Sequence, residues 1–287
     1  MKKKPIIPII IALAPVIYAN VFAIYPFLML IYYSFHSYVF GKRPIFCGLY
    51  NYVRLFNDPV FLHSCYITGI YTLTTVTVEF ILGLFIAYLL YKIRFGKGTF
   101  MTLILIPMIM TPAVSGIIWK ILFDPAYGHI NFYLSILGFP RLKWLLQPVL
   151  ALISAMIVDI WQWTPFMVLS IFAGFSAVPK DLIEAAYTDG ASEYAILKDI
   201  MIPYIKPLIL IILLLRTIDS LKVFDTIFTL TRGGPGFETM VMSVLDYVTL
   251  FAYYDIGRAA SIGVTLWILC FMIGLFFMKK YGEIIWG

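Results

Sequence analysis

Two apolar segments of this 287-residue chain carry side chains that could act together on a solute. In each segment the polar and aromatic residues recur at the helical spacing that places them on one face. They are Asp159, Gln162, Trp163 and Phe166 in the first segment, and Arg216, Asp219 and Ser220 in the second. Carboxylates and amides can hydrogen-bond hydroxyl groups, and an aromatic ring offers a flat apolar surface. The set could therefore bind a sugar.

A structural role for the same charges competes with the binding role. Arginine pairs well with a carboxylate away from water, so Asp159 and Arg216 could form an ion pair that never meets a solute. Glu79, on another apolar segment, is a lesser candidate for the binding set. Ionisable side chains are costly inside a bilayer, which makes each of them a candidate for function. The residues alone leave both roles open.

The composition indicates which elements must hold these residues. Hydrophobic residues make up 62% of the chain and charged residues 13%, against about 25% charged residues in a soluble domain. The long unbroken apolar runs favour membrane-spanning helices over the short alternating strands of a barrel. We therefore expect an all-α polytopic membrane protein.

Six segments approach the roughly 20 residues that are needed to cross a bilayer. They are about Pro5–Tyr33, Cys65–Tyr91, Phe100–Phe123, Pro148–Phe175, Pro207–Phe228 and Arg258–Met278. The loops between them are too short to bury cores of their own, so we expect residues 1–287 to form a single transmembrane domain. The opening MKKKPIIPIIIALAP could begin a cleaved signal peptide, but the uncharged run continues to Tyr33, which favours a span.

The orientation follows from lysine and arginine, which are enriched on the cytoplasmic side of a membrane. With a cytoplasmic N-terminus, the inner flanks carry more of these residues than the outer loops do. The inner set includes Lys2, Lys3, Lys4 and Arg94 as well as Lys279 and Lys280. We therefore expect both termini, and the loop at 176–206 between the fourth and fifth spans, to be cytoplasmic.

Several kinds of site are missing from the sequence. It contains no G-x-x-x-x-G-K-[ST] phosphate loop and no H-E-x-x-H pattern, and its histidines and cysteines lack metal-ligand spacing. No basic stripe of the kind that binds nucleic acid is present. We expect no catalytic residue, metal or cofactor on this chain. Cys47 and Cys65 could pair or could be ordinary apolar residues, and the sequence leaves that open.

The loop at 176–206 is unusually charged for this chain and predicts two short helices around a glycine. Ser176 can cap the first helix, and Gly190 permits the left-handed turn that ends it. Ser192 can cap the second helix, which Pro203 would stop. In the second helix four apolar residues share one face, namely Ile196, Leu197, Ile200 and Met201.

Two surfaces could receive this loop, a lipid headgroup layer or a protein. Helices that lie on lipid are usually rich in lysine and arginine. Here five acids outnumber three lysines: Asp181, Glu184, Asp189, Glu193 and Asp199 against Lys180, Lys198 and Lys206. The charge balance favours a protein partner.

The same loop resembles the cytoplasmic "EAA" signature of ABC-importer permeases. The pattern is Glu184-Ala185-Ala186, three residues, Gly190, nine residues, Ile200, one residue and Ile202-Pro203, with Ile202 where leucine is usual. The resemblance implies a coupling helix that docks in a cleft of a separate ATPase and transmits its closure to the spans. The residues that it assigns to coupling are Glu184, Ala185, Ala186, Asp189, Gly190, Ser192, Leu197 and Pro203.

Three further stretches, Leu105–Asn131, Asp159–Ser192 and Lys222–Thr239, are similar to carbohydrate-uptake permeases of the maltose and glycerol-3-phosphate type. The Gly233-Gly234-Pro235-Gly236 turn and the C-terminal ending look like the first of the two paired permeases. The resemblance implies a multi-pass subunit of a bacterial or archaeal inner membrane. Its implied partners are a second permease, two ATPases that hold ATP and magnesium, and an extracytoplasmic solute-binding protein.

Other functions remain compatible with the sequence. The solute could be a non-sugar such as glycerol-3-phosphate, since Arg216 or Lys222 could serve an anion. An ion-coupled secondary transporter should show Gly- or Pro-broken spans in paired repeat positions, and we recognise none. A membrane scaffold without transport is the third alternative. The sequence names neither the sugar nor its length, and it does not assign the solute contacts to this subunit or to its partner.

Overall fold

The computed structural model describes residues 15, 18, 20–93 and 95–286. Part of the predicted first span, Pro5–Tyr33, lies outside the described residues, as do Lys2, Lys3, Lys4 and Arg94 of the orientation argument. The described part of this span is a short apolar stretch, Asn20–Ser34. The count of six spans therefore stays a prediction.

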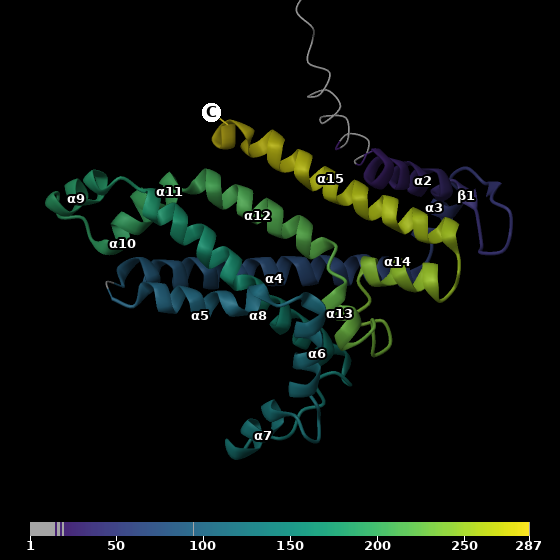
Figure 1. Cartoon of the computed structure of the whole chain (residues 1–287), viewed down its shortest axis with the longest axis horizontal. Helices are drawn as coiled ribbons and strands as arrows, with labels where there is room; N and C mark the ends of the chain where they lie inside the picture. Colours follow the sequence, from purple (N-terminus) through teal and green to yellow (C-terminus); the bar gives the residue numbers. More distant parts are fainter. Residues whose placement is uncertain (1–14, 16–17, 19, 94, 287) are drawn as a thin grey trace, which may run out of the picture. The chain divides into compact units, whose positions relative to one another are not determined.

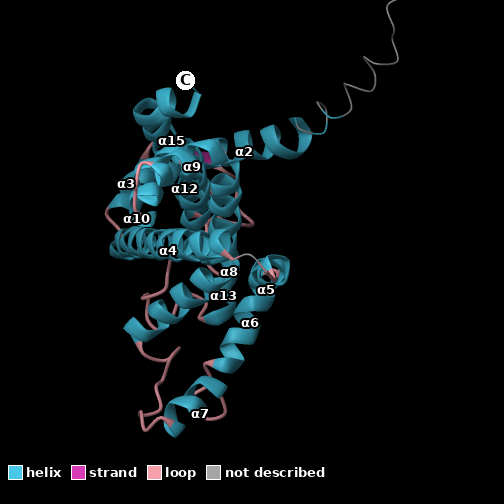
Figure 2. Cartoon of the chain, turned by 90° about the vertical axis from the view of Figure 1, so that its left-hand side faces the viewer, coloured by secondary structure: helices cyan, strands magenta, loops and turns pink. Residues whose placement is uncertain are grey.

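Most of the described residues are helical, and loops connect the helices (Figures 1 and 2). This is the expected consequence of an apolar chain that must satisfy its backbone hydrogen bonds internally. The elements are η1 (Asn20–Ile24), α2 (Tyr25–Ser34), β1 (His36–Ser37), β2 (Ile45–Phe46), α3 (Tyr50–Phe56), α4 (Pro59–Lys92), α5 (Lys97–Ile109), α6 (Pro112–Leu122), α7 (His129–Ile136), α8 (Pro148–Ala177), α9 (Lys180–Thr188), α10 (Glu193–Ala195), η2 (Ile196–Met201), α11 (Ile202–Tyr204), α12 (Lys206–Leu221), α13 (Asp225–Leu230), α14 (Met242–Phe251) and α15 (Ile256–Trp286).

Within the described ranges, 3 straight helices are long and apolar enough to cross a membrane, and the number rises to 5 if each of two bent helix pairs is one span. The straight helices are α4, α8 and α15, which contain the predicted second, fourth and sixth spans. The predicted third span coincides with one bent pair, and the predicted fifth span lies within the second member of the other pair, Lys206–Leu230. An all-α membrane protein is therefore confirmed at the level of these spans.

The predicted third span, Phe100–Phe123, is not one straight helix. It is divided between α5 and α6, which meet at an angle of 94°. Thr111 precedes Pro112 and has extended backbone (ψ 142°), because a residue before proline is pushed out of the helical region. Pro112 then begins α6, where its missing N–H is not needed. The predicted span is therefore bent, and the structure allows it to be one broken span.

The predicted fifth span, Pro207–Phe228, is also interrupted. Its helix α12 ends at Leu221, and the chain becomes helical again only at Asp225 in α13. The α13 helix packs against α6, and a side chain at Gly116 of α6 would overlap Thr229 of α13. Glycine at position 116 therefore allows the two short helices to approach closely.

The chain divides into two compact units, residues 1–62 with 245–268 and residues 63–244 with 269–287. The first unit contains the antiparallel β1–β2 pair, with His36 opposite Phe46. The Asn51 side chain holds this unit together by donating to the carbonyls of Ser34 and His36, both at 2.9 Å. Arg54 pairs with Asp255 at 3.3 Å, and Arg258 pairs with Asp58.

The core of the second unit joins the long helices to the loop at 176–206. Met167, Ile171 and Phe175 of α8 are fully buried, and they belong to one apolar cluster with Ala87 of α4 and Met201 of η2. A side chain at Gly83 of α4 would overlap Met167, which shows how closely α4 and α8 pack. The loop is therefore anchored in the same core as the spans.

Candidate functional site

A buried cluster of charges lies at the centre of the second unit. Arg216 of α12 donates from Nε and Nη2 to the two carboxylate oxygens of Glu79 on α4, at 2.7 and 2.9 Å. The same Nη2 donates to Asp159 on α8. The three side chains are at most 2% exposed. One arginine thus holds two carboxylates and ties three helices together.

This arrangement confirms the predicted ion pair between Asp159 and Arg216, and it adds Glu79 as a second acceptor. Planar bidentate pairing is the geometry that favours arginine over lysine in such a position. Glu79 is separated from Arg216 by 137 positions in the chain. Its place in the sequence indicated an intramembrane carboxylate but not its partner.

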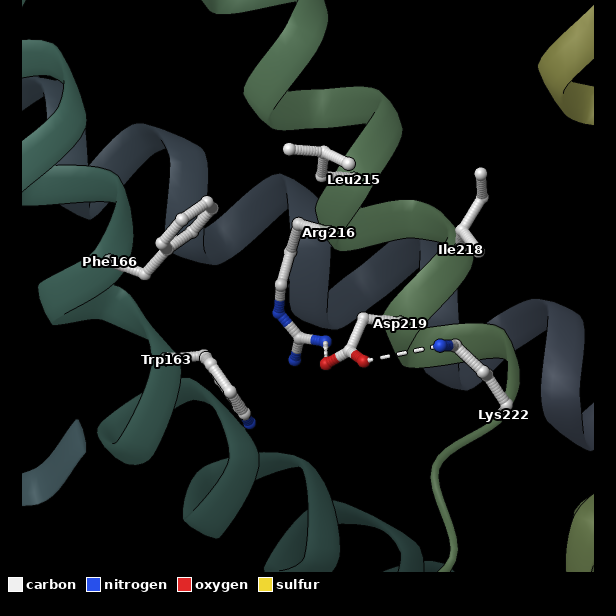
Figure 3. Close-up of a pocket in the computed structure, with 7 residues that line it drawn as sticks. All are labelled: Trp163, Phe166, Leu215, Arg216, Ile218, Asp219 and Lys222. Atoms are coloured by element: carbon white, nitrogen blue, oxygen red, sulfur yellow. Dashed lines mark ion pairs between the residues drawn. The ribbon is translucent and has the colours of Figure 1, made fainter. Parts of the chain in front are cut away.

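Trp163, Phe166, Arg216 and Asp219, from the predicted binding set, lie around a cavity of about 350 Å³ (Figure 3). The remaining lining residues are Leu215, Ile218 and Lys222. The Arg216 guanidinium lies 5.3 Å from the centre of the Trp163 ring. Asp219 stands between two cations, 3.6 Å from Arg216 and 3.8 Å from Lys222. Both Asp219 and Lys222 are about half exposed, so they can meet a solute.

A smaller cavity of about 160 Å³ shares four of these residues and extends the same site. It also borders Asp159 and reaches the two helix breaks, through Pro112 at the start of α6 and Val223–Thr226 between α12 and α13. Irregular backbone at membrane depth is tolerated where it is buried in protein or lines a cavity. The breaks that the sequence analysis missed are therefore part of the site, together with Lys222 and Asp225.

Two members of the predicted binding set have other surroundings. Gln162 donates to the carbonyl of Met110 at 2.8 Å, at the bend between α5 and α6. Ser220 lies against α4, 3.2 Å from the Thr75 hydroxyl. Both side chains are buried, and neither lines the two cavities. Helical spacing grouped them with the other members of the set but did not predict what these two side chains would contact.

The loop at 176–206 forms the predicted pair of helices around Gly190. Gly190 has a left-handed backbone (φ +80°), and its N–H donates to the Tyr187 carbonyl while Ala191 N–H donates to Ala186. These two hydrogen bonds form a Schellman cap, which satisfies the last carbonyls of α9. Ser192 accepts from Ala195 N–H at 3.2 Å and caps the second helix. Both predictions are confirmed.

Two details of the predicted loop are wrong. Ser176 does not cap α9, because it still belongs to α8 and donates to the Phe172 carbonyl at 2.9 Å. Pro203 does not stop the second helix. It occupies the first turn of α11, where its missing N–H is tolerated, and the chain bends only after Tyr204, by 68°.

The loop has a buried side and an exposed side. Ala186, Ile196 and Met201 pack into the core, and Leu197 and Ile200 contact it. The opposite side exposes Glu184, Ala185, Asp189, Gly190 and Pro203. Large apolar side chains are exposed there as well, with Leu182 at 48%, Tyr187 at 52% and Tyr194 at 70%. Such a mixed patch is typical of a protein interaction surface.

A charged contact connects this loop to the end of α4. Lys92 donates to Glu193, the first residue of α10. This hydrogen bond raises the pKa of Lys92 above its usual value. Tyr88, Tyr91, Lys92, Ile183, Tyr187, Glu193, Ile196 and Met201 surround a cavity of about 230 Å³ beneath the loop. Motion of the loop can therefore reach α4 directly.

Cofactor and metal sites are not evident in the described ranges. No group of three His, Cys, Asp or Glu side chains there could hold a metal ion. Cys47, Cys65 and Cys270 are free thiols, so Cys47 and Cys65 are not paired in this structure.

Comparison with known proteins gives consistent results. Residues 79–281 match the family model described as "Binding-protein-dependent transport system inner membrane component". The trehalose/maltose transport system permease protein MalF of Thermococcus litoralis is 39% identical over 91% of this chain and 87% of its own length. The sulfoquinovosyl glycerol transport system permease protein SmoG of Agrobacterium fabrum is 32% identical over 94% of this chain and 89% of its own.

Among solved structures, a chain of the bacterial alginate ABC transporter, in complex with an alginate pentasaccharide-bound periplasmic protein, has the same fold. The TM-score is 0.87 at 21% identity, and the match covers 98% of this chain and 95% of that chain.

Proposed function

Because the chain belongs to the family of binding-protein-dependent transport system inner membrane components, we propose that it is one permease subunit of an ABC importer that takes up a sugar. It is a non-catalytic, multi-pass inner-membrane subunit that binds no cofactor of its own, and ATP is handled by separate ATPase subunits. We propose the class of solute, the partner subunits and the residues that bind each of them.

The observation that carries the proposal is the loop at 176–206. Its acidic and apolar outer side is free for a partner, while its inner side packs into the core that holds α4 and α8. We assign docking on an ATPase to Glu184, Ala185, Asp189 and Gly190, with Ala186, Ser192, Leu197 and Pro203 maintaining the shape of the loop. The small exposed residue Ala185 lets a partner surface approach closely, and Ala186 lets α9 pack closely on the core.

A sugar is the solute that the cavity between α8 and α12 suits. Trp163 and Phe166 can stack against the apolar face of a sugar ring, and Asp219 and Lys222 can hydrogen-bond its hydroxyl groups. The names of the similar permeases point to the same class, since they transport trehalose and maltose or a sugar-glycerol conjugate. Gln162, Asp159, Arg216 and Ser220 then maintain the walls of the path.

The proposed assembly contains this chain and a second permease as a pair, of which this chain is the first member. Two ATPases bind on the cytoplasmic side and a solute-binding protein binds outside, in a bacterial or archaeal inner membrane. We propose six spans in one transmembrane domain, with both termini and the 176–206 loop in the cytoplasm. The excess of lysine and arginine on the inner flanks supports this orientation.

In this assembly, closure of the ATPases draws the two coupling loops together and favours the outward-open state of the cavity, and ATP hydrolysis returns it to the inward-open state. ATP can shift this equilibrium only because the ATPase dimer binds one state of the permease pair more tightly than the other. The packing of Met201 and Ile205 against α8, together with the Lys92–Glu193 contact, supplies the connection between loop and spans.

Reconstitution tests the proposal. The chain, its partner permease, the ATPases and the binding protein are placed in proteoliposomes, and uptake of labelled maltose or trehalose is measured with and without ATP. We expect uptake only with ATP and the binding protein. Uptake driven by an ion gradient without ATP would instead identify a secondary transporter, a class in which broken helices such as α5–α6 also occur.

A further inference from the structure

The positive charge of Arg216 is already paired with carboxylates of this chain. Its guanidinium contacts Glu79, Asp159 and Asp219, and its flat face covers Trp163. With an exposure of 2%, the side chain has little surface left for a solute. Arg216 therefore cannot act as the anion-binding residue that its presence in the sequence alone would allow.

The remaining charges at the site make it acidic. In the described part of the chain, the two cavities are bordered by Asp159, Asp219 and Asp225, and Glu79 lies directly behind Arg216. The cations among these lining residues are Arg216 and Lys222, and Lys222 is itself 3.8 Å from Asp219. Three carboxylates and two cations thus border the cavities, and Glu79 lies behind Arg216 without lining either of them. A confined site with an excess of one sign of charge repels solutes of that sign, and low-dielectric walls strengthen the effect.

We infer that the solute is an uncharged sugar, and that the carboxylates of this site exclude sugars that carry a phosphate or a carboxylate. This inference rests on the proposed function and adds the charge of the substrate to it. The exclusion acts through repulsion, which is a common source of specificity. The similar permeases do not decide the point, because their names include trehalose and maltose as well as sulfoquinovosyl glycerol, which carries a sulfonate.

Asp219 is the residue that sets this specificity most directly. It is 48% exposed, lines both cavities and stands between the two cations. Replacing it by asparagine keeps the size and the hydrogen-bonding capacity of the side chain but removes one negative charge. The positive charges of Lys222 and Arg216 would then be balanced by one carboxylate fewer. An anionic sugar would therefore meet weaker repulsion.

The test uses the complete transporter in proteoliposomes, with maltose and maltose 6′-phosphate as probes. The affinity of the binding protein for each sugar is measured separately by calorimetry, and both sugars are supplied at saturating levels for it. We expect the wild-type complex to transport maltose at least about tenfold faster than the phosphate ester. Asp219→Asn should reduce that ratio by about tenfold, the scale expected for one charge a few ångströms from the solute.

Glu238→Gln is the matched control, because it removes the same charge at a position that lines neither cavity. It should leave the ratio unchanged. Asp225→Asn provides a second variant if Asp219→Asn fails to assemble, and it should shift the ratio in the same direction. Wild-type transport of the phosphate ester at the rate of maltose, or an unchanged ratio in both aspartate variants, would overturn the inference. Loss of all ATP-dependent sugar uptake by the wild type would instead refute the proposed function.

Discussion

Arg216 illustrates how a charge can be kept inside a membrane protein. Its two carboxylate partners come from different helices, so the three charges are satisfied only when α4, α8 and α12 are packed together. Burying a charge without a partner is strongly unfavourable, whereas a paired and hydrogen-bonded group can be accommodated. The cluster therefore specifies one arrangement of the three helices.

Replacing Arg216 by methionine should destabilise the protein strongly, because Glu79 and Asp159 would stay buried without a cation. The expected loss of unfolding free energy is about 3–5 kcal/mol. Thermal unfolding of the purified complex measures it. The triple variant Glu79→Leu, Asp159→Leu, Arg216→Met should recover most of the loss, since no buried charge remains. If the triple variant is no more stable than Arg216→Met, the cluster does not act as a charge-balanced unit.

Trp163 should contribute to sugar binding through its ring. Trp163→Ala is expected to raise the KM for sugar about tenfold, which corresponds to roughly 1.4 kcal/mol of lost stacking and contact. Trp163→Phe should retain most of the affinity. Trp161→Ala is the matched control, because Trp161 lies on the same helix but meets Trp119 edge to face and lines neither cavity of the site. Equal effects at positions 161 and 163 would argue against a sugar contact at Trp163.

At the scale of single residues, the sequence predicted the chemistry better than the contacts. Depth in the apolar segments and helical spacing identified Asp159, Arg216 and Trp163 as candidates for the site. The alternative that Asp159 and Arg216 form an ion pair could also be inferred from the sequence. The role of Glu79 was not predictable, because its meeting with Arg216 depends on how two helices distant in sequence pack. Lys222 was recognised only as an alternative ligand for an anion and was not placed in the binding set; it directly follows the last residue of α12.

Among the elements, the loop at 176–206, to which we assign coupling, depends on its cap at Gly190. A Cβ at this position would meet no atom within 4 Å, so a larger residue would act only through the backbone. Gly190→Val should strain the left-handed turn by about 1–3 kcal/mol. We expect weaker co-purification of the ATPase, with unchanged membrane insertion.

Gly190→Asn is the control for this prediction. Asparagine tolerates the left-handed conformation and should retain most of the ATPase docking. If the valine variant binds and drives the ATPase as well as the asparagine variant does, the left-handed cap has no part in coupling.

The contact between Lys92 and Glu193 should matter for coupling more than for stability, because it is exposed to solvent. Lys92→Glu is expected to lower sugar uptake per ATP hydrolysed, and the exchange Lys92→Glu with Glu193→Lys should restore it. Uptake and ATP hydrolysis are measured on the same vesicles. An exchange variant as poorly coupled as Lys92→Glu alone would contradict the assignment.

The pH dependence of this contact has a defined sign. Because the pKa of Lys92 is raised in the folded protein, Lys92 stays charged below the normal lysine pKa of 10.5, and its contribution to the contact is lost only as the pH rises through the higher folded value. Titration of Lys92 should therefore not change the amount of sugar taken up per ATP hydrolysed between about pH 6 and 9. A change in that ratio in the wild type that disappears in Lys92→Met would contradict this prediction.

Helices were predictable from the apolar runs, but their interruptions were not. Pro112 and Pro203 both occupy first-turn positions, yet the chain bends sharply before Pro112 and continues as a helix through Pro203. Proline alone therefore does not say whether a helix begins anew or continues. The packing around each proline determines whether a new helix begins or the helix continues. Near Pro112 the α6 helix contacts α13, and near Pro203 the side chains of Met201 and Ile205 are buried.

In the whole molecule, a cavity within the spans is connected through the chain to a loop outside them. The cavity lies between α8 and α12, and the loop at 176–206 is the connection between those same two helices. A displacement of the loop therefore acts on both walls of the cavity at once. This connectivity is the physical reason why a docking element at this place can control access to a solute site.

Cross-linking of the loop to the ATPase tests that claim most directly. Ala185→Cys is introduced after Cys47, Cys65 and Cys270 have been replaced by serine, and the assembled transporter is treated with a short thiol cross-linker. Ala185 is exposed on the outer side of the loop, so the variant should form a cross-link to an ATPase carrying a cysteine in its docking cleft, with a yield that changes with ATP. Absence of any cross-link in a transporter that still takes up sugar, or labelling of position 185 from outside intact cells, would contradict the account.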